Sequence, residues 1–430
     1  MLTARRLLAI CLALCATFAA QPALADHVVV KRHVTLRAEP VRTSQALDFP
    51  EIGATLKVLD GGQEDHKYYH VRDGAGHEGW IYSTFVELVP DVTGVTPEAL
   101  LPPSGQVMQV HYINVDQGAA ALIEFPCAAI MIDAGGRTGA DTAHILNYLQ
   151  EFFARRTDLG GKIAAVFVTH THIDHDLSLK AVGEAYPIAG YIENGAKKGS
   201  GLDPAKWMRS LVAAHSGAIG YDPVSETDVL AAGTAGLTNS VIDPVKCQGV
   251  DPDIRVLSGR YDINPGWPQG EFDKNGNLQS LVIKIVFGKA SFLFTGDLED
   301  TAIDTLLDHW QGTTMLDADV WQVGHHGSYN GATSALLAAI TPKVAVIQMG
   351  RETPQEKWTA WDYGHPRRVA IDLLTASLSE TRPPKTVRVA DAQHVFSDYH
   401  LTKAIYATGW DGDVTVRADA TGSITPLLGQ

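Results

Sequence analysis

The sequence has few cysteines, no excess of basic residues and, beyond its first 25 residues, no long hydrophobic run. It contains 34 lysines and arginines against 49 aspartates and glutamates, which gives a formal net charge of −15. This charge repels phosphate backbones at long range and argues against strong nonspecific binding to nucleic acid. The sequence also lacks a GxSxG motif, a P-loop and a dinucleotide-binding glycine motif, which argues against a serine-hydrolase elbow or a nucleotide-cradling loop.

The N-terminus is the one strongly apolar region. Arg5 and Arg6 precede an apolar segment at residues 7–20, and residues 23–25 (ALA) match a signal-peptidase site. We expect residues 1–25 to be a signal peptide, and the protein to be exported, periplasmic or secreted, with no stable membrane insertion after cleavage. A membrane anchor is the alternative, but the run is shorter than the ~20 residues of a spanning helix.

Export bears on the four cysteines. Cys11 and Cys15 would leave with the signal peptide, so the mature chain would keep Cys127 and Cys247. An oxidising compartment allows these two to pair, and two separate buried thiols are the alternative. Neither residue lies in a CxxC motif, which disfavours a thiolate metal site.

Residues 26–90 predict a small all-β domain, because short alternating segments are separated by Gly and Asp turns. The segments VTLRAEP, IGATLKVL and GHEGWIYSTFVEL, with the pair Gly79-Trp80, resemble a bacterial SH3 domain, which implies a small barrel. Such domains commonly bind cell-wall peptides, so a cell-wall ligand is one expectation and a structural appendage is the other. The proline-rich residues 91–106 are expected to form a linker.

Residues 107–418 predict a mixed α/β domain. Apolar, β-branched runs such as AAIMIDAGG, KIAAVFVTH and ASFLFTGD alternate with helical stretches such as LEDTAIDTLLDHW. This pattern is typical of sheets covered by helices. Residues 195–272 interrupt it with many Gly, Asp and Pro residues, and we expect them to be an insertion over the body of the domain.

The segment HTHIDHD (residues 170–176) directly follows the apolar run KIAAVFV. It places His170, His172, Asp174 and His175 on a strand-to-helix loop. Imidazole and carboxylate ligands suit zinc, manganese or iron. One ion would rarely use all four side chains, so the spacing favours two ions that share the loop. A solvated polar loop is the alternative, which the density of ligand side chains beside an apolar strand disfavours.

Other apolar runs also end in Asp or His. Asp133 ends IMIDAGG, Asp297 ends FLFTGD, His325 and His326 follow VWQVG, and His365 lies in WDYGHP. Polar strand ends are common singly. Together they predict that several strands end at one common rim.

The motifs HYINVDQGAAALIE, IMIDAGG, VTHTHIDHD, NGNLQSLVIKI, SFLFTGDLE, VGHHGS and YGHP, in this order, resemble the metallo-β-lactamase superfamily, and most closely the hydrolase-like domain of the ComEC competence proteins. The resemblance implies an αββα sandwich with two divalent ions, zinc or manganese, at one edge. It implies that His170 and His172 hold one ion, that Asp174, His175 and His326 hold the other, and that Asp297 bridges them.

The resemblance leaves the later histidines open. His326 is assigned to the second ion and His325 to the substrate, but the reverse order, or His365 as the final ligand, is an alternative. Asp174 or Asp297 would accept a proton from the attacking water. His325 or His365 would protonate the leaving group or hydrogen-bond a phosphoryl oxygen.

Several positions depart from the family pattern. Ala119 stands where an acidic residue is usual, residues 176–178 (DLS) replace a common Ile-Gly-Gly, and Asp362 replaces a frequent Asn. His215 is the only histidine between the HTHIDHD cluster and the TGD motif, and we expect it to be structural. The first ion would therefore have an open position. Asp133 is expected to orient ligands rather than to bind metal.

These observations predict an exported hydrolase that uses a metal-activated water on a phosphodiester, such as a nucleic acid, a nucleotide or a phosphorylated wall polymer. The HHGS and GHP motifs favour this substrate class, and the acidic charge disfavours long DNA unless cations screen it. One alternative is a lactone, thioester or β-lactam hydrolase of the same fold. Another is a wall-binding protein with a non-catalytic metal scaffold, which the ligand set disfavours.

Overall fold

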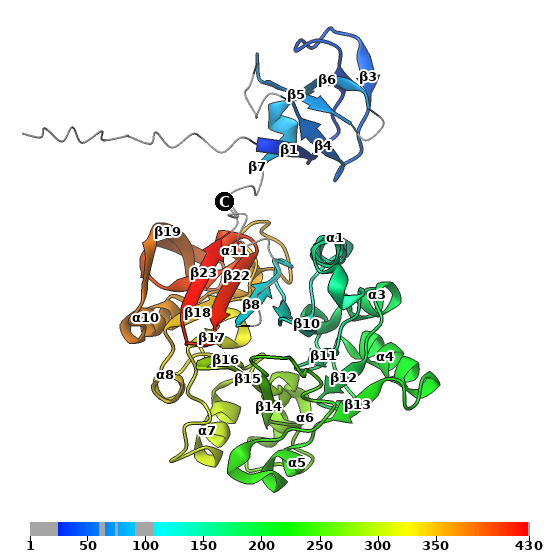
Figure 1. The fold of residues 1–430 in the computed structure, drawn as a ribbon. Coiled ribbons are helices and arrows are strands. Elements are labelled where there is room, and N and C mark those ends of the chain that lie inside the picture. Colours follow the sequence, from blue (N-terminus) through cyan, green and yellow to red (C-terminus); the bar gives the residue numbers. More distant parts are fainter. Residues whose placement is uncertain (1–24, 60–64, 74–75, 91–105, 429–430) are drawn as a thin grey trace, which may run out of the picture. The chain divides into compact units, whose positions relative to one another are not determined.

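The structure, a computed structural model, describes residues 25–59, 65–73, 76–90 and 106–428 (Figure 1). The chain divides into two units, with the boundary between Thr96 and Pro97. The predicted signal peptide (apart from its last residue) and the predicted linker (apart from residue 106) lie outside the described residues. None of the helices in the described part of the chain is long and apolar enough to cross a bilayer.

The first unit is an all-β structure, as the alternating segments predict. Its strands form one sheet in the order β3-β2-β6-β5-β4-β1-β7. Gly79 is required here, because a Cβ at this position would lie 2.4 Å from the carbonyl oxygen of Arg37. The likeness to an SH3 barrel stays a prediction. The strands are β1 (Ala25–Val30), β2 (Leu36–Arg37), β3 (Ala46–Asp48), β4 (Thr55–Val58), β5 (Tyr68–Arg72), β6 (Glu78–Tyr82) and β7 (Val86–Pro90).

The second unit contains two large sheets and confirms the mixed α/β prediction. The first sheet has the order β13-β12-β11-β10-β9-β8-β22-β23. It continues past residue 418, where the sequence analysis ends the domain, because β23 pairs with β22. Its strands are β8 (Val107–Tyr112), β9 (Ala120–Glu124), β10 (Ala129–Ala134), β11 (Ala165–Val168), β12 (Gly190–Glu193), β13 (Gly220–Pro223), β22 (Val414–Asp419) and β23 (Ile424–Leu428).

The second sheet has the order β14-β15-β16-β17-β18-β21, and a separate hairpin is formed by β19 and β20. The two large sheets share one hydrophobic core, in which Tyr112 of the first sheet stacks on Phe294 of the second. The strands are β14 (Asp253–Ser258), β15 (Val282–Phe287), β16 (Ala290–Phe294), β17 (Val320–Gln322), β18 (Val344–Ile347), β19 (Thr381–Ala392), β20 (Val395–Lys403) and β21 (Ile405–Ala407).

Helices cover the sheets. A second hydrophobic cluster packs α1 (Gly139–Arg155), α3 (Leu179–Ala185) and α4 (Leu202–Ala214) on the first sheet. Buried side chains at Ile145, Leu149 and Phe152 recur at helical spacing along α1, which is why that helix lies on the sheet. The remaining helices are α2 (Ile173–Asp176), α5 (Glu226–Ala231), α6 (Gln269–Lys274), α7 (Asp300–His309), α8 (Ser334–Ile340), α9 (Ala360–Tyr363), α10 (Arg368–Ser377) and α11 (Thr408–Asp411).

Residues 195–272 are more than the expected insertion. They contribute β13 to one edge of the first sheet and β14 to one edge of the second. The sequence pattern fails here because β13 is an edge strand whose residues (GYDP) are exposed or half-buried, so no apolar run marks it.

Parallel pairing sets the position of the candidate site. Strands β10, β11 and β12 run parallel in the first sheet, and β16, β17 and β18 run parallel in the second. The carboxyl ends of parallel neighbours emerge at the same edge of a sheet. The loops that follow β11, β16 and β17 carry the HTHIDHD, TGD and HHGS motifs, which the fold thereby brings together.

A disulfide joins Cys127, which follows β9, to Cys247 in the segment before β14. This is the pairing that export makes possible. It closes a segment of 120 residues, and cross-linking so long a segment restricts the unfolded chain.

We therefore expect thiol titration of the unreduced mature protein to detect neither cysteine. Reduction should release both thiols and lower the free energy of unfolding by about 2–4 kcal/mol. Two reactive thiols in the unreduced, denatured protein would show that the bridge is absent.

Glu226 gives the second unit a pH-dependent stability. Its side chain is buried at the start of α5 and accepts a hydrogen bond from the backbone N–H of Gly259 (2.8 Å). Burial raises the pKa of this carboxyl to about 7. Because the pKa is higher in the folded state, the stabilisation is complete below the unfolded-state pKa of about 4.3 and is lost as the pH rises through 7.

Replacing Glu226 by Gln should remove this dependence. We expect the loss of unfolding free energy between pH 5 and pH 8 to be greater in the parent protein than in Glu226→Gln by about 2–3 kcal/mol. Denaturant unfolding of both proteins at both pH values, in the presence of a chelator, measures the difference. An equal loss in the two proteins would contradict the assignment.

Candidate metal centre

The HTHIDHD loop begins where β11 ends and turns into α2. Glycines let neighbouring loops lie directly against it. A Cβ at Gly135 would lie 1.6 Å from the carbonyl oxygen of Asp174, and the backbone N–H of Ala119 donates to the same oxygen at 2.8 Å. The HTHIDHD loop therefore packs directly against the DQG and DAGG segments of the sequence.

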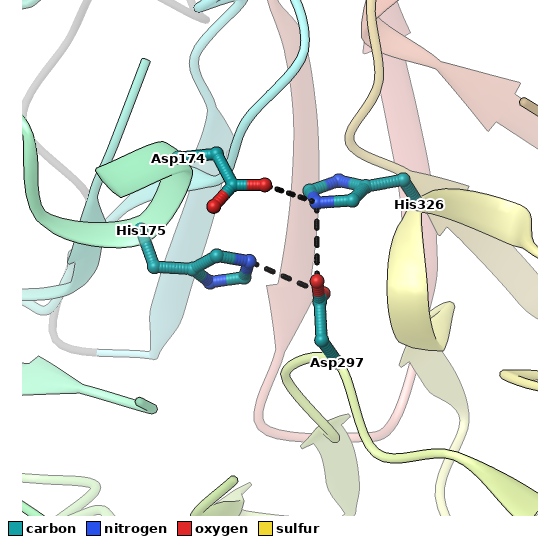
Figure 2. A group of neighbouring side chains, drawn as sticks. All are labelled: Asp174, His175, Asp297 and His326. Carbon is teal, nitrogen blue, oxygen red and sulfur yellow. Dashed lines mark ion pairs between the residues drawn. The ribbon is translucent and has the colours of Figure 1, made fainter. Parts of the chain in front are cut away.

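Four of the predicted ligands meet in one group, in which Asp174 is half-buried and the others are buried: Asp174, His175, Asp297 and His326 (Figure 2). One ligand atom from each lies within 4.8 Å of the others. His175 Nε2 lies 3.2 Å from Asp297 Oδ1, and His326 Nε2 lies 3.3 Å from Asp297 Oδ2. His326 Nε2 is also 3.3 Å from Asp174 Oδ2. Asp297 therefore contacts both histidines, as a bridging residue would.

Hydrogen bonds at Nδ1 fix the orientation of the His175 and His326 imidazoles. His175 Nδ1 donates to Asp133 Oδ2 (2.7 Å), and His326 Nδ1 donates to the carbonyl oxygen of Gln348 (2.7 Å). With Nδ1 donating on the far side, each ring turns its Nε2 towards the group, where a bound cation would replace a second proton. Both Nε2 atoms and Asp297 Oδ1 are buried without a hydrogen-bond partner. Such a set of lone pairs fits a divalent cation.

Electrostatics lead to the same conclusion. Burial alone would lower the pKa of His326, but the negative charges of Asp297 and Asp174 beside its Nε2 raise it to about 10. Burial would raise the pKa of Asp297, but His326 and His175 hold it well below its usual range. The ionised carboxylates are therefore stabilised by positive charge between them. Protons on the histidines supply that charge, and a bound cation would replace these protons.

The other two predicted ligands form an adjacent pair. His170 Nε2 lies 3.0 Å from His172 Nδ1, and the His170 ring centroid lies 4.2 Å from that of His175. Burial lowers the pKa of His170 well below its usual value, which keeps the ring neutral. Within the described residues, this pair does not belong to any group of three or more clustered ligands. A first ion held here would keep positions open, as the sequence leads us to expect.

A cavity of about 460 Å³ opens over both positions. It is lined by His172, Asp174, Asp297, His325, His326 and His365, together with residues that the motifs did not single out: Gln117, Arg137, Asn277, Trp358 and Tyr363. A signal for the last two is present in the segment WTAWDYGHP, where three aromatic residues precede the GHP motif. Nothing in the periodicity of the sequence distinguishes them from core residues.

The three later histidines differ in environment. His326 is buried within the ligand group, whereas the His325 side chain is 20% exposed and its Nδ1 donates to Asn330 Oδ1 (3.0 Å). His365 Nδ1 accepts a hydrogen bond from the side-chain amide of Gln117 (3.2 Å).

The tautomer of His365 follows from its neighbours. The orientation of the Gln117 amide is set by Gly350, whose backbone N–H donates to Gln117 Oε1 (3.3 Å). His365 Nδ1 is therefore an acceptor, and the proton lies on Nε2. Burial lowers the pKa of His365 well below its usual value, so the ring stays neutral and offers an N–H donor rather than a bare ligand nitrogen.

The remaining residues singled out in the sequence fall outside the ligand group. Asp133 holds His175 and Thr169 from behind, as expected. His215 is exposed at the end of α4, and its Nδ1 donates to the Leu211 carbonyl oxygen. Asp176 is buried without a hydrogen-bond partner, and burial raises its pKa to about 9. Its carboxyl fills the space that Gly201 leaves free.

Comparison with known proteins agrees with this geometry. Residues 113–351 match the family model described as metallo-beta-lactamase superfamily, and the chain belongs to that superfamily. Within it, the chain is distantly related to competence proteins. It is 25% identical to ComE operon protein 3 of Bacillus subtilis (62% of this chain, 30% of the relative) and 33% identical to Competence protein ComA of Neisseria gonorrhoeae (30% and 17%).

The chain thus spans less than a third of the length of these relatives. Among solved structures, human tRNase Z, short form, is similar at 14% identity and a TM-score of 0.29, covering 55% of this chain and 91% of that chain. A likeness this remote bears on neither the substrate nor the reaction.

Asp133 offers a test of the ligand group that does not depend on turnover. Replacing Asp133 by Ala removes the acceptor that orients His175, so we expect zinc affinity to fall about 10–100-fold. Competition with a chromophoric chelator measures the affinity, and circular dichroism monitors the fold. Asp304→Asn, on the exposed face of α7, is the control and should bind zinc like the parent. Unchanged affinity in a folded Asp133→Ala protein would refute the assignment.

Proposed function

We propose that this protein is an exported, metal-dependent phosphodiesterase. The observation that carries the proposal is the cluster of candidate ligands at the base of the cavity: the His170–His172 pair lies beside the Asp174, His175, Asp297 and His326 group, in which three buried ligand atoms have no hydrogen-bond partner. These residues would hold two neighbouring divalent cations, with Asp297 between them. Such cations lower the pKa of water and neutralise negative charge on a phosphoryl group.

The chain's own residues would do the rest of the chemistry. Asp174 and Asp297 are ionised, because the neighbouring histidines hold the pKa of each carboxyl below its usual value, and either one can accept a proton from the attacking water. His365 would donate its Nε2–H to a phosphoryl oxygen or to the leaving group. His325, at the cavity wall, would contact the substrate.

Two considerations favour a phosphodiester over a lactone, thioester or β-lactam. Two adjacent cations match a substrate that is itself anionic, and neutral histidines beside them add hydrogen bonds without adding charge. One relative is named for competence, and a further one, 35% identical over 23% of this chain and 11% of its own length, is Recombination protein 2 of Haemophilus influenzae. Nucleic acids and nucleotides are therefore the first substrates to test, and phosphorylated wall polymers the second.

Export and the N-terminal unit complete the proposal. The basic and apolar residues of segment 1–25 support cleavage and release to the periplasm or the medium. The first unit would then act as an SH3-like module with a cell-wall ligand.

The first experiment measures metal content together with hydrolysis of bis-p-nitrophenyl phosphate. We expect about two zinc or manganese ions per chain at saturation, loss of turnover on chelation, and recovery when either metal is restored. Asp297→Ala should abolish turnover in a folded protein, because the shared carboxylate is lost. Asp304→Asn should keep parent activity.

The possible results of this experiment distinguish the proposed function from its alternatives. Metal binding without phosphodiester turnover would move the assignment to lactone, thioester and β-lactam substrates. Failure to bind either metal would leave the HTHIDHD cluster without a role and favour a wall-binding protein. Full turnover by Asp297→Ala would remove Asp297 from the mechanism.

A further inference from the structure

Two aromatic side chains stand exposed at the cavity that contains the candidate metal centre. Trp358 is 65% exposed and Tyr363 is 37% exposed, and both line the cavity together with Asp174 and Asp297. Their ring centroids lie 6.3 Å apart with an angle of 50° between the planes. Large aromatic residues usually bury most of their area, so the exposed ring of Trp358, next to Tyr363 and beside the candidate metal centre, indicates a contact surface for a ligand.

The loop that carries these rings is fixed in place. The backbone N–H of Trp358 donates to Asp362 Oδ2 (3.0 Å), and Asp362 Oδ1 is paired with His394 Nε2 (3.1 Å). His394 lies between β19 and β20 and also stacks on Trp361, at 4.0 Å between centroids. On the cavity side, Tyr363 stacks on His365. The rings are therefore held at a set position relative to the candidate catalytic histidine.

Several polar side chains of the cavity already have partners within the protein, whereas Asn277 Oδ1 has none. The Gln117 amide bonds to His365 and Gly350, and Asn277 Nδ2 donates to Glu299 Oε1. Arg137 is paired with Asp116 (3.0 Å) and lies 3.8 Å from Glu356. The ring of Trp358, with the part of Tyr363 that His365 does not cover, is an uncommitted aromatic surface beside the metal centre. This combination suits a planar ring bound by stacking better than a sugar, whose hydroxyls need free hydrogen-bonding groups.

We propose that Trp358 and Tyr363 form a stacking subsite for the nucleobase of a nucleotide phosphodiester. The inference rests on the proposed phosphodiesterase function and specifies its substrate class. Every base has a π-face, so recognition by stacking tolerates different bases. The substrate is then a nucleoside ester or the end of a single strand, in which a base is free to leave its neighbours.

The test compares two esters that release the same p-nitrophenolate: thymidine 5′-(p-nitrophenyl) phosphate and methyl p-nitrophenyl phosphate. With the metal-loaded full chain, we expect the nucleoside ester to have the higher kcat/KM by roughly 10–100-fold. Trp358→Ala should lose most of that preference through KM, with a much larger fall in kcat/KM for the nucleoside ester than for the methyl ester. Trp358→Phe keeps a stacking ring and should retain most of the preference.

A matched sugar ester, glucose 6-(p-nitrophenyl) phosphate, tests the alternative ligand. A gain over the methyl ester equal to that of the nucleoside, lost in Trp358→Ala, would assign the subsite to sugars and overturn the nucleobase. Equal kcat/KM for the thymidine and methyl esters, or an equal loss for both in Trp358→Ala, would also overturn it.

Binding separates this inference from the proposed function. Equilibrium dialysis of thymidine 5′-monophosphate against the parent, Trp358→Ala and Trp358→Phe proteins needs no turnover. If the esters are not hydrolysed but the parent binds the nucleotide at least tenfold more tightly than Trp358→Ala does, the phosphodiesterase proposal fails and the subsite stands. Equal binding by the parent and Trp358→Ala proteins would refute the subsite, whatever the activity.

Discussion

The second unit is organised around two neighbouring carboxylates, the half-buried Asp174 and the buried Asp297. Two like charges placed close together and largely away from water are unfavourable unless positive charge lies between them. His175 and His326 supply it in part, and cations would supply the rest. The two groups come from different sheets, one from the loop after β11 and one from the loop after β16. The ligand group therefore ties the sheets together at the edge where the parallel strands end.

The backbone near the candidate ligands adopts uncommon conformations. Asp133, His325 and His326 all have positive φ, between 49° and 59°, although none is a glycine. Such conformations are uncommon for residues with side chains and persist only where the surroundings hold them. Here Thr169 and His175 hold Asp133, and the Gln348 carbonyl oxygen holds His326. The unfavourable backbone conformations are offset by the contacts that orient the imidazoles of His175 and His326 towards the carboxylates.

The group formed by Asp174, His175, Asp297 and His326 could be predicted because each of these residues belongs to a short motif at the end of an apolar run. The closely spaced His170, His172, Asp174 and His175 carry the metal signal without any knowledge of the fold. The orienting partners could not be predicted, because they come from distant loops: His365 depends on Gln117, some 250 residues earlier in the chain. The same reason explains why β13 and the position of Trp358 could not be predicted. An edge strand and an exposed ring leave no periodic pattern, and their roles arise only when remote segments meet.

The net charge of the chain affects which anions the cavity favours. At −15, the protein as a whole repels polyanions, and within the cavity Arg137 is already matched by Asp116. With the histidines neutral, two divalent cations would outweigh Asp174 and Asp297 and make the base of the cavity locally positive. That attraction is short-ranged, because salt screens exposed charges beyond about 8–10 Å. A small anion that reaches the cavity is then favoured over a long one that must lie along an acidic surface. Affinity for the remainder of such a substrate has to come from uncharged contacts, and exposed aromatic faces provide them.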